Sequence, residues 1–145
     1  MTLPENGPWT LPIDGYDVLQ ITFAYPIDVV AYGDGGVSAA IRLEQGFDIH
    51  DPDGVRHFDA SAQPWEELAG VLALRHDRIA HATATEDDAK LRIEFESGRV
   101  LTAGPHPRYE NWAVTGEGFQ LIAMPGGGVA HFPNGGGIVV APGKP

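Results

Sequence analysis

Six histidines are the side chains that could most directly do chemistry, by binding a metal ion or by moving protons. They are His50, His57, His76, His81, His106 and His131. No two of them have the i, i+4 helical spacing of a zinc protease. His50 and His57 can lie at similar height across the turn at residues 51–54, with Asp48 or Asp59 nearby. A small-molecule or metal-dependent enzyme using His50, His57 and these carboxylates is therefore the alternative function that we carry forward.

Other catalytic patterns are weak in this sequence. There is no cysteine, and no serine sits in a Gly-x-Ser-x-Gly elbow. The glycine runs 126–128 and 135–137 lack the Lys-Ser/Thr that follows a phosphate-binding loop. Glu94 and Glu96 would lie about 6 to 7 Å apart on one strand face, which is more typical of a solvated surface than of an acid and base pair. We expect no catalytic residue, no metal site and no cofactor.

The most distinctive group of residues is Tyr109, Glu110 and Trp112, which follows a proline-rich corner at residues 105–108. Large aromatic rings are costly to expose, and Tyr and Trp usually find a hydrogen bond when they are buried. The favoured interpretation is a structural clamp under the sheet, with Glu110 accepting backbone hydrogen bonds. The alternative is an aromatic and acidic contact site for a partner protein.

Charge indicates which partners are compatible with this chain. It carries 20 acidic against 9 basic residues, a formal net charge of −11, and residues 1–41 contain no Lys or Arg. Binding to nucleic acid or to an anionic membrane needs basic patches, so neither is expected. A basic protein partner is compatible, although an acidic balance also serves solubility alone. The candidate partner-binding residues are Glu86, Asp87, Asp88, Glu94, Glu96, Tyr109 and Glu110.

Composition predicts one globular domain with many turns. The 145 residues are 43% hydrophobic and include 19 glycines and 12 prolines, which favours short strands over long helices. The N-terminus has no signal-peptide pattern, and no run of about 18 apolar residues occurs, so we expect a cytoplasmic protein. We predict a single mainly-β domain over residues 1–132 and a Gly/Pro-rich C-terminal tail over residues 133–145.

Strands are predicted where apolar and polar residues alternate. The clearest hairpin joins residues 91–96 to 99–102, and a further strand covers 119–124 before the structural turn Pro125-Gly126-Gly127. Residues 16–25 are expected to form a strand central to the core. Further strands are predicted at residues 27–32, 37–44, 47–50, 55–58, 75–85 and 129–132. Asp51 to Gly54 has the residues of a hairpin turn and lacks the later ligands of a calcium loop.

One helix is predicted, over residues 61–72. Pro64 suits its first turn, and Trp65, Leu68 and Leu72 have the spacing of an apolar face that could cover the sheet. Trp65 is accordingly expected to be structural. The fold class that follows is α+β and mainly β: one domain with an antiparallel, curled meander sheet of about seven to ten short strands and one short helix.

The pattern Leu91-x-Ile93-x-Phe95-x-x-Gly98, followed by Pro107-x-Tyr109-Glu110-x-Trp112 and Leu121-x-x-x-Pro125-Gly126-Gly127, resembles a family of small, uncharacterised bacterial domains common in actinobacteria. Some neighbours of such domains are immunity proteins of toxin systems. Together with the acidic balance and the absence of a catalytic constellation, the resemblance favours a non-enzymatic protein-binding domain, in its narrower form an immunity factor that neutralises a basic toxin. It supplies no catalytic residue.

Overall fold

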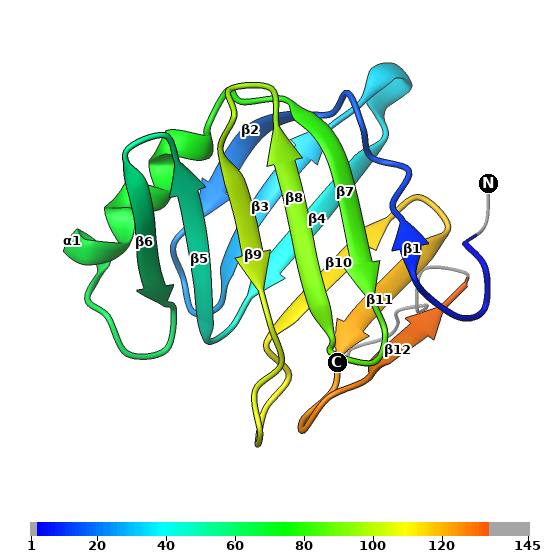
Figure 1. Cartoon of the computed structure of the whole chain (residues 1–145). Coiled ribbons are helices and arrows are strands. Elements are labelled where there is room, and N and C mark those ends of the chain that lie inside the picture. Colours follow the sequence, from blue (N-terminus) through cyan, green and yellow to red (C-terminus); the bar gives the residue numbers. More distant parts are fainter. Residues whose placement is uncertain (1–2, 134–145) are drawn as a thin grey trace.

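Two six-stranded antiparallel sheets pack face to face in the computed structural model, which describes residues 3–133 (Figure 1). Sheet A contains, in spatial order, β1 (Trp9–Thr10), β7 (Ile79–Thr85), β8 (Lys90–Phe95), β9 (Val100–Ala103), β5 (Gly46–Asp51) and β6 (Gly54–Asp59). Sheet B contains β12 (Val129–Phe132), β11 (Phe119–Ala123), β10 (Trp112–Gly116), β4 (Ser38–Leu43), β3 (Ile27–Tyr32) and β2 (Asp17–Thr22). The helical elements are α1 (Trp65–Leu68) and the 3-10 helices η1 (Asp34–Gly36) and η2 (Ala69–Leu74).

The predicted mainly-β single domain with one short helix is confirmed. The single meander of seven to ten strands is wrong, because twelve strands divide between two sheets. The division follows from three crossings between the sheets: from β1 into β2, from β4 into β5 and from β9 into β10. Of the predicted C-terminal tail, residues 134–145 lie outside the described residues. No helix among the described residues is long and apolar enough to cross a membrane.

Alternation explains which side chains form the core. In β4, Ala39, Ile41 and Leu43 are buried and pack in the core cluster, while the residues between them face outward. In β8, Leu91, Ile93 and Phe95 do the same. Side chains of successive strand residues point to opposite faces, so each sheet has an apolar inner face and a more polar outer face. The outer faces are therefore where polar chemistry can be found.

Two predicted strands need correction, and one strand was missed. Residues 16–25 do not form a central strand: β2 is an edge strand of sheet B with a bulge between Val18 and Gln20, and Leu19 is exposed. The strand predicted from residue 75 begins at Ile79, because His76 has a positive φ of 72°. The strand β10, which was not predicted, pairs with β4 and β11 at the centre of sheet B.

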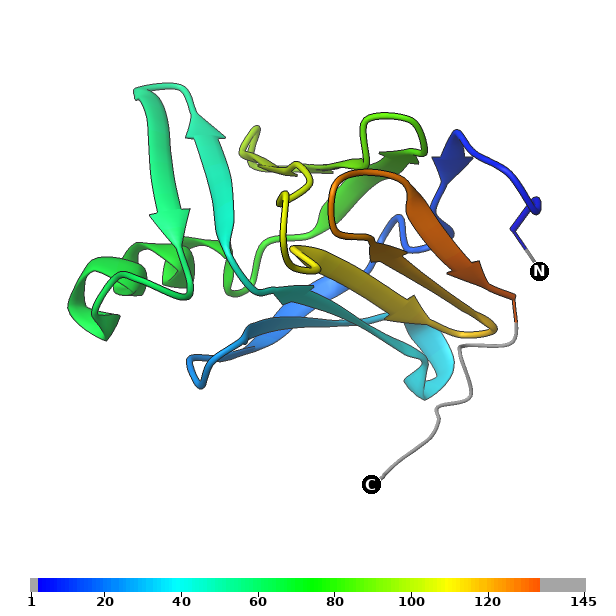
Figure 2. The same ribbon diagram turned by 90° about the horizontal axis from the view of Figure 1, so that it is seen from below.

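The predicted helix over residues 61–72 is also wrong in extent. Asp59 accepts hydrogen bonds from Ser61, and Gln63 accepts one from the Asp59 N–H, so the chain turns before the helix begins. The α-helix then covers four residues and continues as η2. Leu68 is buried, but Trp65 is 67% exposed. Figure 2 shows these helices at the foot of the β5–β6 hairpin, at one end of the sandwich.

Candidate functional site

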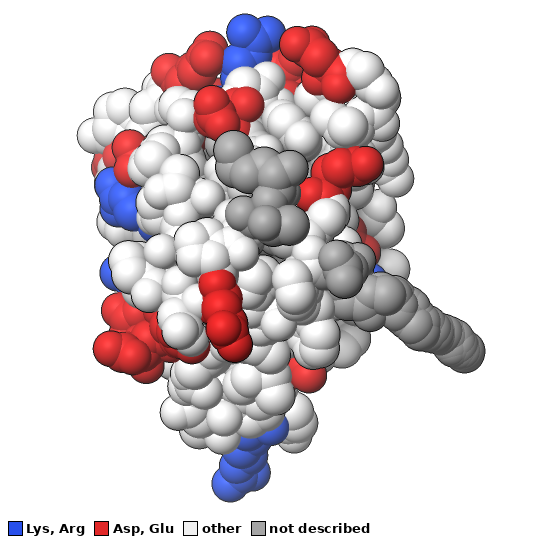
Figure 3. All heavy atoms as spheres, turned by 90° about the vertical axis from the view of Figure 1, so that its right-hand side faces the viewer, with Lys and Arg blue, Asp and Glu red and all other residues white. Residues whose placement is uncertain are grey.

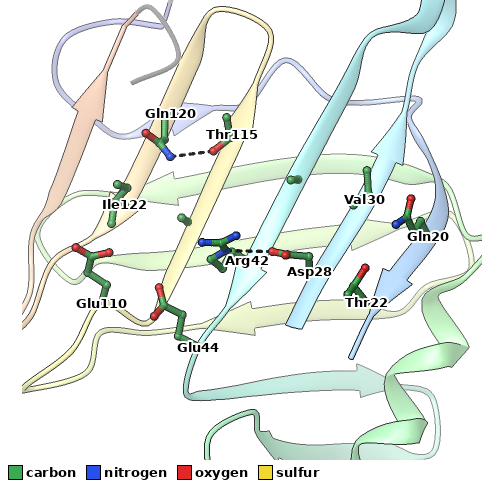
Figure 4. A pocket seen from close by; sticks show the side chains of 12 residues that line it. Gln20, Thr22, Asp28, Val30, Arg42, Glu44, Glu110, Thr115, Gln120 and Ile122 are labelled. Carbon is green, nitrogen blue, oxygen red and sulfur yellow. Dashed lines mark hydrogen bonds and ion pairs between the residues drawn. The ribbon is translucent and has the colours of Figure 1, made fainter. Parts of the chain in front are cut away.

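The outer face of sheet B holds a hollow of about 370 Å³, which we call the sheet B hollow (Figure 4). Strand pairing places its lining in two neighbouring rows across the sheet. The first row is Gln20, Val30, Ala40, Thr115 and Gln120, and the second is Thr22, Asp28, Arg42, Ala113 and Ile122. Glu44 and Glu110 complete the lining at one end. Five different strands or their flanking residues thus contribute to one site.

The floor of the sheet B hollow is small and apolar. Ala40 and Ala113 lie on neighbouring central strands, with Val30 and Ile122 beside them. Alanine side chains are short, so the longer polar side chains around them form walls. A ligand with an apolar part and a polar head would find a complementary surface for both parts.

The charges in the sheet B hollow are unevenly distributed. Arg42 donates from Nε to Asp28 Oδ1 at 3.2 Å, so its positive charge is already paired. Glu44 and Glu110 lie at the same end of the hollow in Figure 4, and within residues 3–133 neither forms an ion pair with a basic side chain. Burial and the nearby Glu110 carboxylate raise the pKa of Glu44 above its usual 4.5, while Arg42 opposes the shift. The end of the hollow is therefore a place where a cation would be stabilised.

Asn111 holds the β4–β5 and β9–β10 crossings together, beside both carboxylates. Its buried side chain donates from Nδ2 to the Gly46 carbonyl at 2.8 Å and to the Gly104 carbonyl at 2.7 Å, and Oδ1 accepts from Gln45 N–H at 2.8 Å. Glu44 N–H also donates to the Asn111 carbonyl at 2.8 Å. The bonds to Gln45 and Gly46 thus join the β9–β10 connection to the β4–β5 crossing, and the bond to Gly104 lies within the β9–β10 connection itself.

Trp112 follows Asn111 directly and places its side chain in the core. Its ring is fully buried, and Nε1 donates to the Ala89 carbonyl at 2.8 Å, in the turn between β7 and β8. A strand of sheet B is thereby tied to a turn of sheet A. This arrangement agrees with a clamp role for Trp112.

Tyr109 does not share that role. It is 55% exposed and packs beside His106, with ring centroids 5.1 Å apart, because the chain at residues 105–109 loops outward before it enters β10. The turn at Pro125, Gly126 and Gly127 contacts this loop through a hydrogen bond from Gly126 N–H to the His106 carbonyl at 2.8 Å. Gly126 and Gly127 have positive φ angles of 80° and 118°, which suits glycine.

The outer face of sheet A carries a second hollow, of about 470 Å³, which contains the predicted His57. His57 Nδ1 lies 2.5 Å from Asp48 Oδ1 across the β5–β6 pair, and Lys90, Asp88 and Thr102 line the same hollow. His50 lies two residues beyond Asp48 and contacts Thr102 Oγ1 through Nε2 at 3.2 Å. The structure thus brings the predicted histidines to one face of one hairpin.

No metal centre is evident at this hairpin. Within residues 3–133, no group of three or more His, Cys, Asp or Glu side chains is arranged to hold a metal ion. Asp59 lines the hollow but makes its hydrogen bonds to Ser61. An Asp48–His57 pair can still orient an imidazole for proton transfer, which is the part of the alternative function that geometry supports.

The predicted partner-binding residues do not form one surface. Glu86, Asp87 and Asp88 occupy the turn between β7 and β8, where Glu86 Oε1 accepts a hydrogen bond from Gly7 N–H at 3.1 Å and Asp88 accepts one from Thr85. Glu94 pairs with Arg92 at 3.2 Å on sheet A, and Glu96 is exposed beyond the end of β8. Of the seven predicted residues, Glu110 alone lines the sheet B hollow. Figure 3 shows separate acidic groups on one side of the molecule rather than one continuous patch.

Sequence reasoning missed Asp28, Arg42, Glu44 and Asn111. The alternation in residues 37–44 predicts that Arg42 and Glu44 face outward, but alternation alone does not say which residues lie across from them. Asn111 occupied the unspecified position between Glu110 and Trp112. A buried amide in a corner could be suspected from its two neighbours, but two of its three partners, Gln45 and Gly46, lie more than sixty residues away.

A family model described as a family of unknown function (DUF6188) matches residues 9–133. The matched range contains both hollows and the corner at Asn111 and Trp112. No curated protein and no solved structure matches the chain.

Proposed function

We propose that this protein, which belongs to the DUF6188 family of unknown function, is a non-enzymatic binding protein for a basic protein partner. In its narrower form the proposal is a bacterial immunity factor that neutralises a basic toxin. One observation carries the proposal: Glu44 and Glu110 face one end of the sheet B hollow, and neither is ion-paired within the described residues.

A basic side chain of a partner would complement this hollow. Two nearby carboxylates repel each other in the free protein, and a cation between them replaces repulsion by attraction. The aliphatic stem of Lys or Arg can lie along the floor formed by Ala40 and Ala113. Arginine is favoured over lysine because its planar guanidinium can bond both carboxylates.

The overall charge supports the same partner class. A net charge of −11 attracts a basic protein over a distance of about 10 Å at 0.1 M salt and accelerates association. Charge of this kind affects the rate of encounter more than the final affinity. The hollow supplies the local contacts that general attraction does not.

The test is calorimetric titration of the purified protein with the product of the neighbouring gene. We expect that Glu44→Gln combined with Glu110→Gln weakens binding at least about tenfold, which corresponds to 1.4 kcal/mol. Ala40→Leu keeps every charge but fills the hollow, so it should weaken binding similarly. Glu117→Gln, an exposed residue between β10 and β11 that does not line the hollow, is the matched control.

The pH dependence of binding provides a further check on the same site. Because the pKa of Glu44 is raised, Glu44 takes up its proton at a higher pH than an ordinary glutamate. On acidification, affinity should therefore begin to fall at a higher pH than an ordinary glutamate would cause, and Glu44→Gln should remove this part of the dependence. If the gene product neither binds nor is inhibited, or if Glu117→Gln weakens binding as much as the double variant, the proposal fails.

The second candidate function is a small-molecule or metal-dependent enzyme at the sheet A hollow. It is favoured by the close pairing of His57 Nδ1 with Asp48 Oδ1, which fixes the direction of the imidazole. This function predicts stoichiometric divalent metal or a hydrolytic activity, either of which His57→Ala abolishes. Elemental analysis without metal, an unchanged melting temperature on adding zinc and no loss of any activity in His57→Ala would together exclude it.

A further inference from the structure

A small cleft at the helical end of the sandwich is lined entirely by apolar side chains. Phe23, Trp65, Ala69 and Leu72 enclose about 120 Å³ between the end of β2 and the helices α1 and η2. The hollows on the two sheet faces, by contrast, are lined by a mixture of apolar, polar and charged residues. We call this feature the apolar cleft.

Two of the four side chains that line the apolar cleft, Trp65 and Leu72, are exposed although they are large and apolar. Trp65 is 67% and Leu72 is 48% exposed, and Tyr25, two residues beyond Phe23, is also exposed. Within residues 3–133 the Trp65 indole N–H has no hydrogen-bond partner, whereas Trp9 and Trp112 each donate to a backbone carbonyl. Trp65 therefore contributes little to the fold. Exposed aromatic clusters of this kind are typical of protein contact sites.

We propose that the apolar cleft receives an apolar side chain from a basic segment of the partner protein. Glu66 and Glu67 directly follow Trp65 and are both exposed, so they can pair with Lys or Arg residues that flank the inserted side chain. A second copy of this chain would bring the same two glutamates and a further net charge of −11 to the contact. Charge complementarity thus selects a basic partner over self-association.

This inference rests on the proposed function, because it assigns a second contact to the same partner. The two sites are close along the chain at the end of β2: Thr22 lines the sheet B hollow, and the next residue, Phe23, lines the apolar cleft. On this inference, one partner protein places a basic side chain in the hollow and an apolar side chain in the cleft. Trp65 would act as the central aromatic contact of the second site.

The fluorescence of Trp65 can be used to test this inference. Trp9 and Trp112 are buried, so the neutral quencher acrylamide should reach mainly Trp65. The probe is a synthetic amphipathic peptide of leucine and lysine, with a leucine–glutamate and a serine–lysine peptide of equal length as controls. We expect the leucine–lysine peptide alone to shift tryptophan emission to shorter wavelength and to reduce quenching. Equal effects from the serine–lysine peptide, or no protection of Trp65, would overturn the inference.

Variants identify the contacts through calorimetry with the same peptide. Trp65→Ala and Leu72→Ser should each weaken binding at least tenfold, and Glu66→Gln with Glu67→Gln should weaken binding and reduce its salt dependence. Val55→Ser is the matched control for Leu72→Ser, because Val55 and Leu72 are both 48% exposed but Val55 lies on β6, outside the cleft. Concentration-dependent dimerisation that Trp65→Ala abolishes would instead assign the cleft to a second copy and overturn the inference.

The two proposals can fail separately. If the neighbouring gene product binds and Glu44→Gln with Glu110→Gln weakens that binding while Trp65→Ala does not, the sheet B hollow is a site and the apolar cleft is not. If the gene product does not bind at all, the proposed function fails, and the inference about the cleft fails with it. Weakening by both sets of variants supports both sites.

Discussion

Trp112→Ala is expected to lower the free energy of unfolding by about 3 to 5 kcal/mol, the usual range for a buried Trp replaced by Ala. The substitution leaves a cavity between the sheets and removes the donor to the Ala89 carbonyl. A loss of this size is a large share of the 5 to 15 kcal/mol typical of a whole domain. Urea unfolding followed by circular dichroism measures it, and the variant should melt far lower than the wild type.

Two further tryptophan variants make this prediction specific. Trp65→Ala removes the same side chain from an exposed position and should change stability by no more than about 0.5 kcal/mol. Trp112→Phe keeps most of the ring but loses the hydrogen bond to Ala89, so its effect should lie between the two. A Trp112→Ala protein that unfolds like the wild type would show that the ring does not hold the sheets together.

Asn111→Ala should be nearly as damaging, with a loss of about 3 kcal/mol or more, although it removes only a small side chain. Three backbone groups at the crossings lose their partner: Gln45 N–H and the carbonyls of Gly46 and Gly104. A buried polar group left without a hydrogen bond costs about 1 to 3 kcal/mol. Asn6→Ala, at an exposed asparagine, is the matched control and should remain within about 0.5 kcal/mol.

Asn111→Asp tests the same bonds without changing the shape of the side chain. An aspartate can still accept from Gln45 N–H, but it turns an oxygen toward the Gly46 and Gly104 carbonyls. Burial and these carbonyls should raise the pKa of the introduced carboxyl in the folded state. Stability should then be greatest at acidic pH and fall as the pH rises through that pKa. Equal stability of Asn111→Asp and wild type at pH 7 would contradict the role assigned to Nδ2.

Asn111→Ala and Asn111→Asp should both also affect the sheet B hollow. Glu44 directly precedes Gln45, and Glu110 directly precedes Asn111, so both lie next to backbone that Asn111 ties together. The two glutamates are far apart along the chain. If the connections held by Asn111 loosen, the two carboxylates no longer lie together at one end of the hollow. Partner affinity should therefore fall in Asn111→Ala even at temperatures where the protein remains folded.

The sequence by itself determined the local part of this structure. Alternation in residues 37–44 and 91–96 predicts two strands, observed at 38–43 and 90–95, and the faces that they bury, because the side-chain period of a strand is a local property of the backbone. The residues of the turn at 51–54 predict a hairpin for a similar reason, and Asp51 indeed accepts from Asp53 N–H at 2.8 Å. The mainly-β class follows from these local signals.

Local signals also failed in a consistent way. The apolar spacing of Trp65 and Leu72 predicted a buried helix face, but spacing states only that two side chains share a side. The turn bonds of Asp59 and Gln63 shortened the helix, and its position at the end of the sandwich left Trp65 without a surface to cover. Tyr109 and Trp112 looked alike in sequence, yet one is exposed and the other is fully buried.

Only the tertiary structure decided what the outward-facing residues do. Glu44 and Glu110 belong to segments far apart in the chain, and they meet because β4 pairs with β10 in one sheet while β5 pairs with β9 in the other. Alternation predicts the face of a strand but not its neighbour, since pairing between distant strands depends on the packing of the whole core. The candidate site is a product of that pairing.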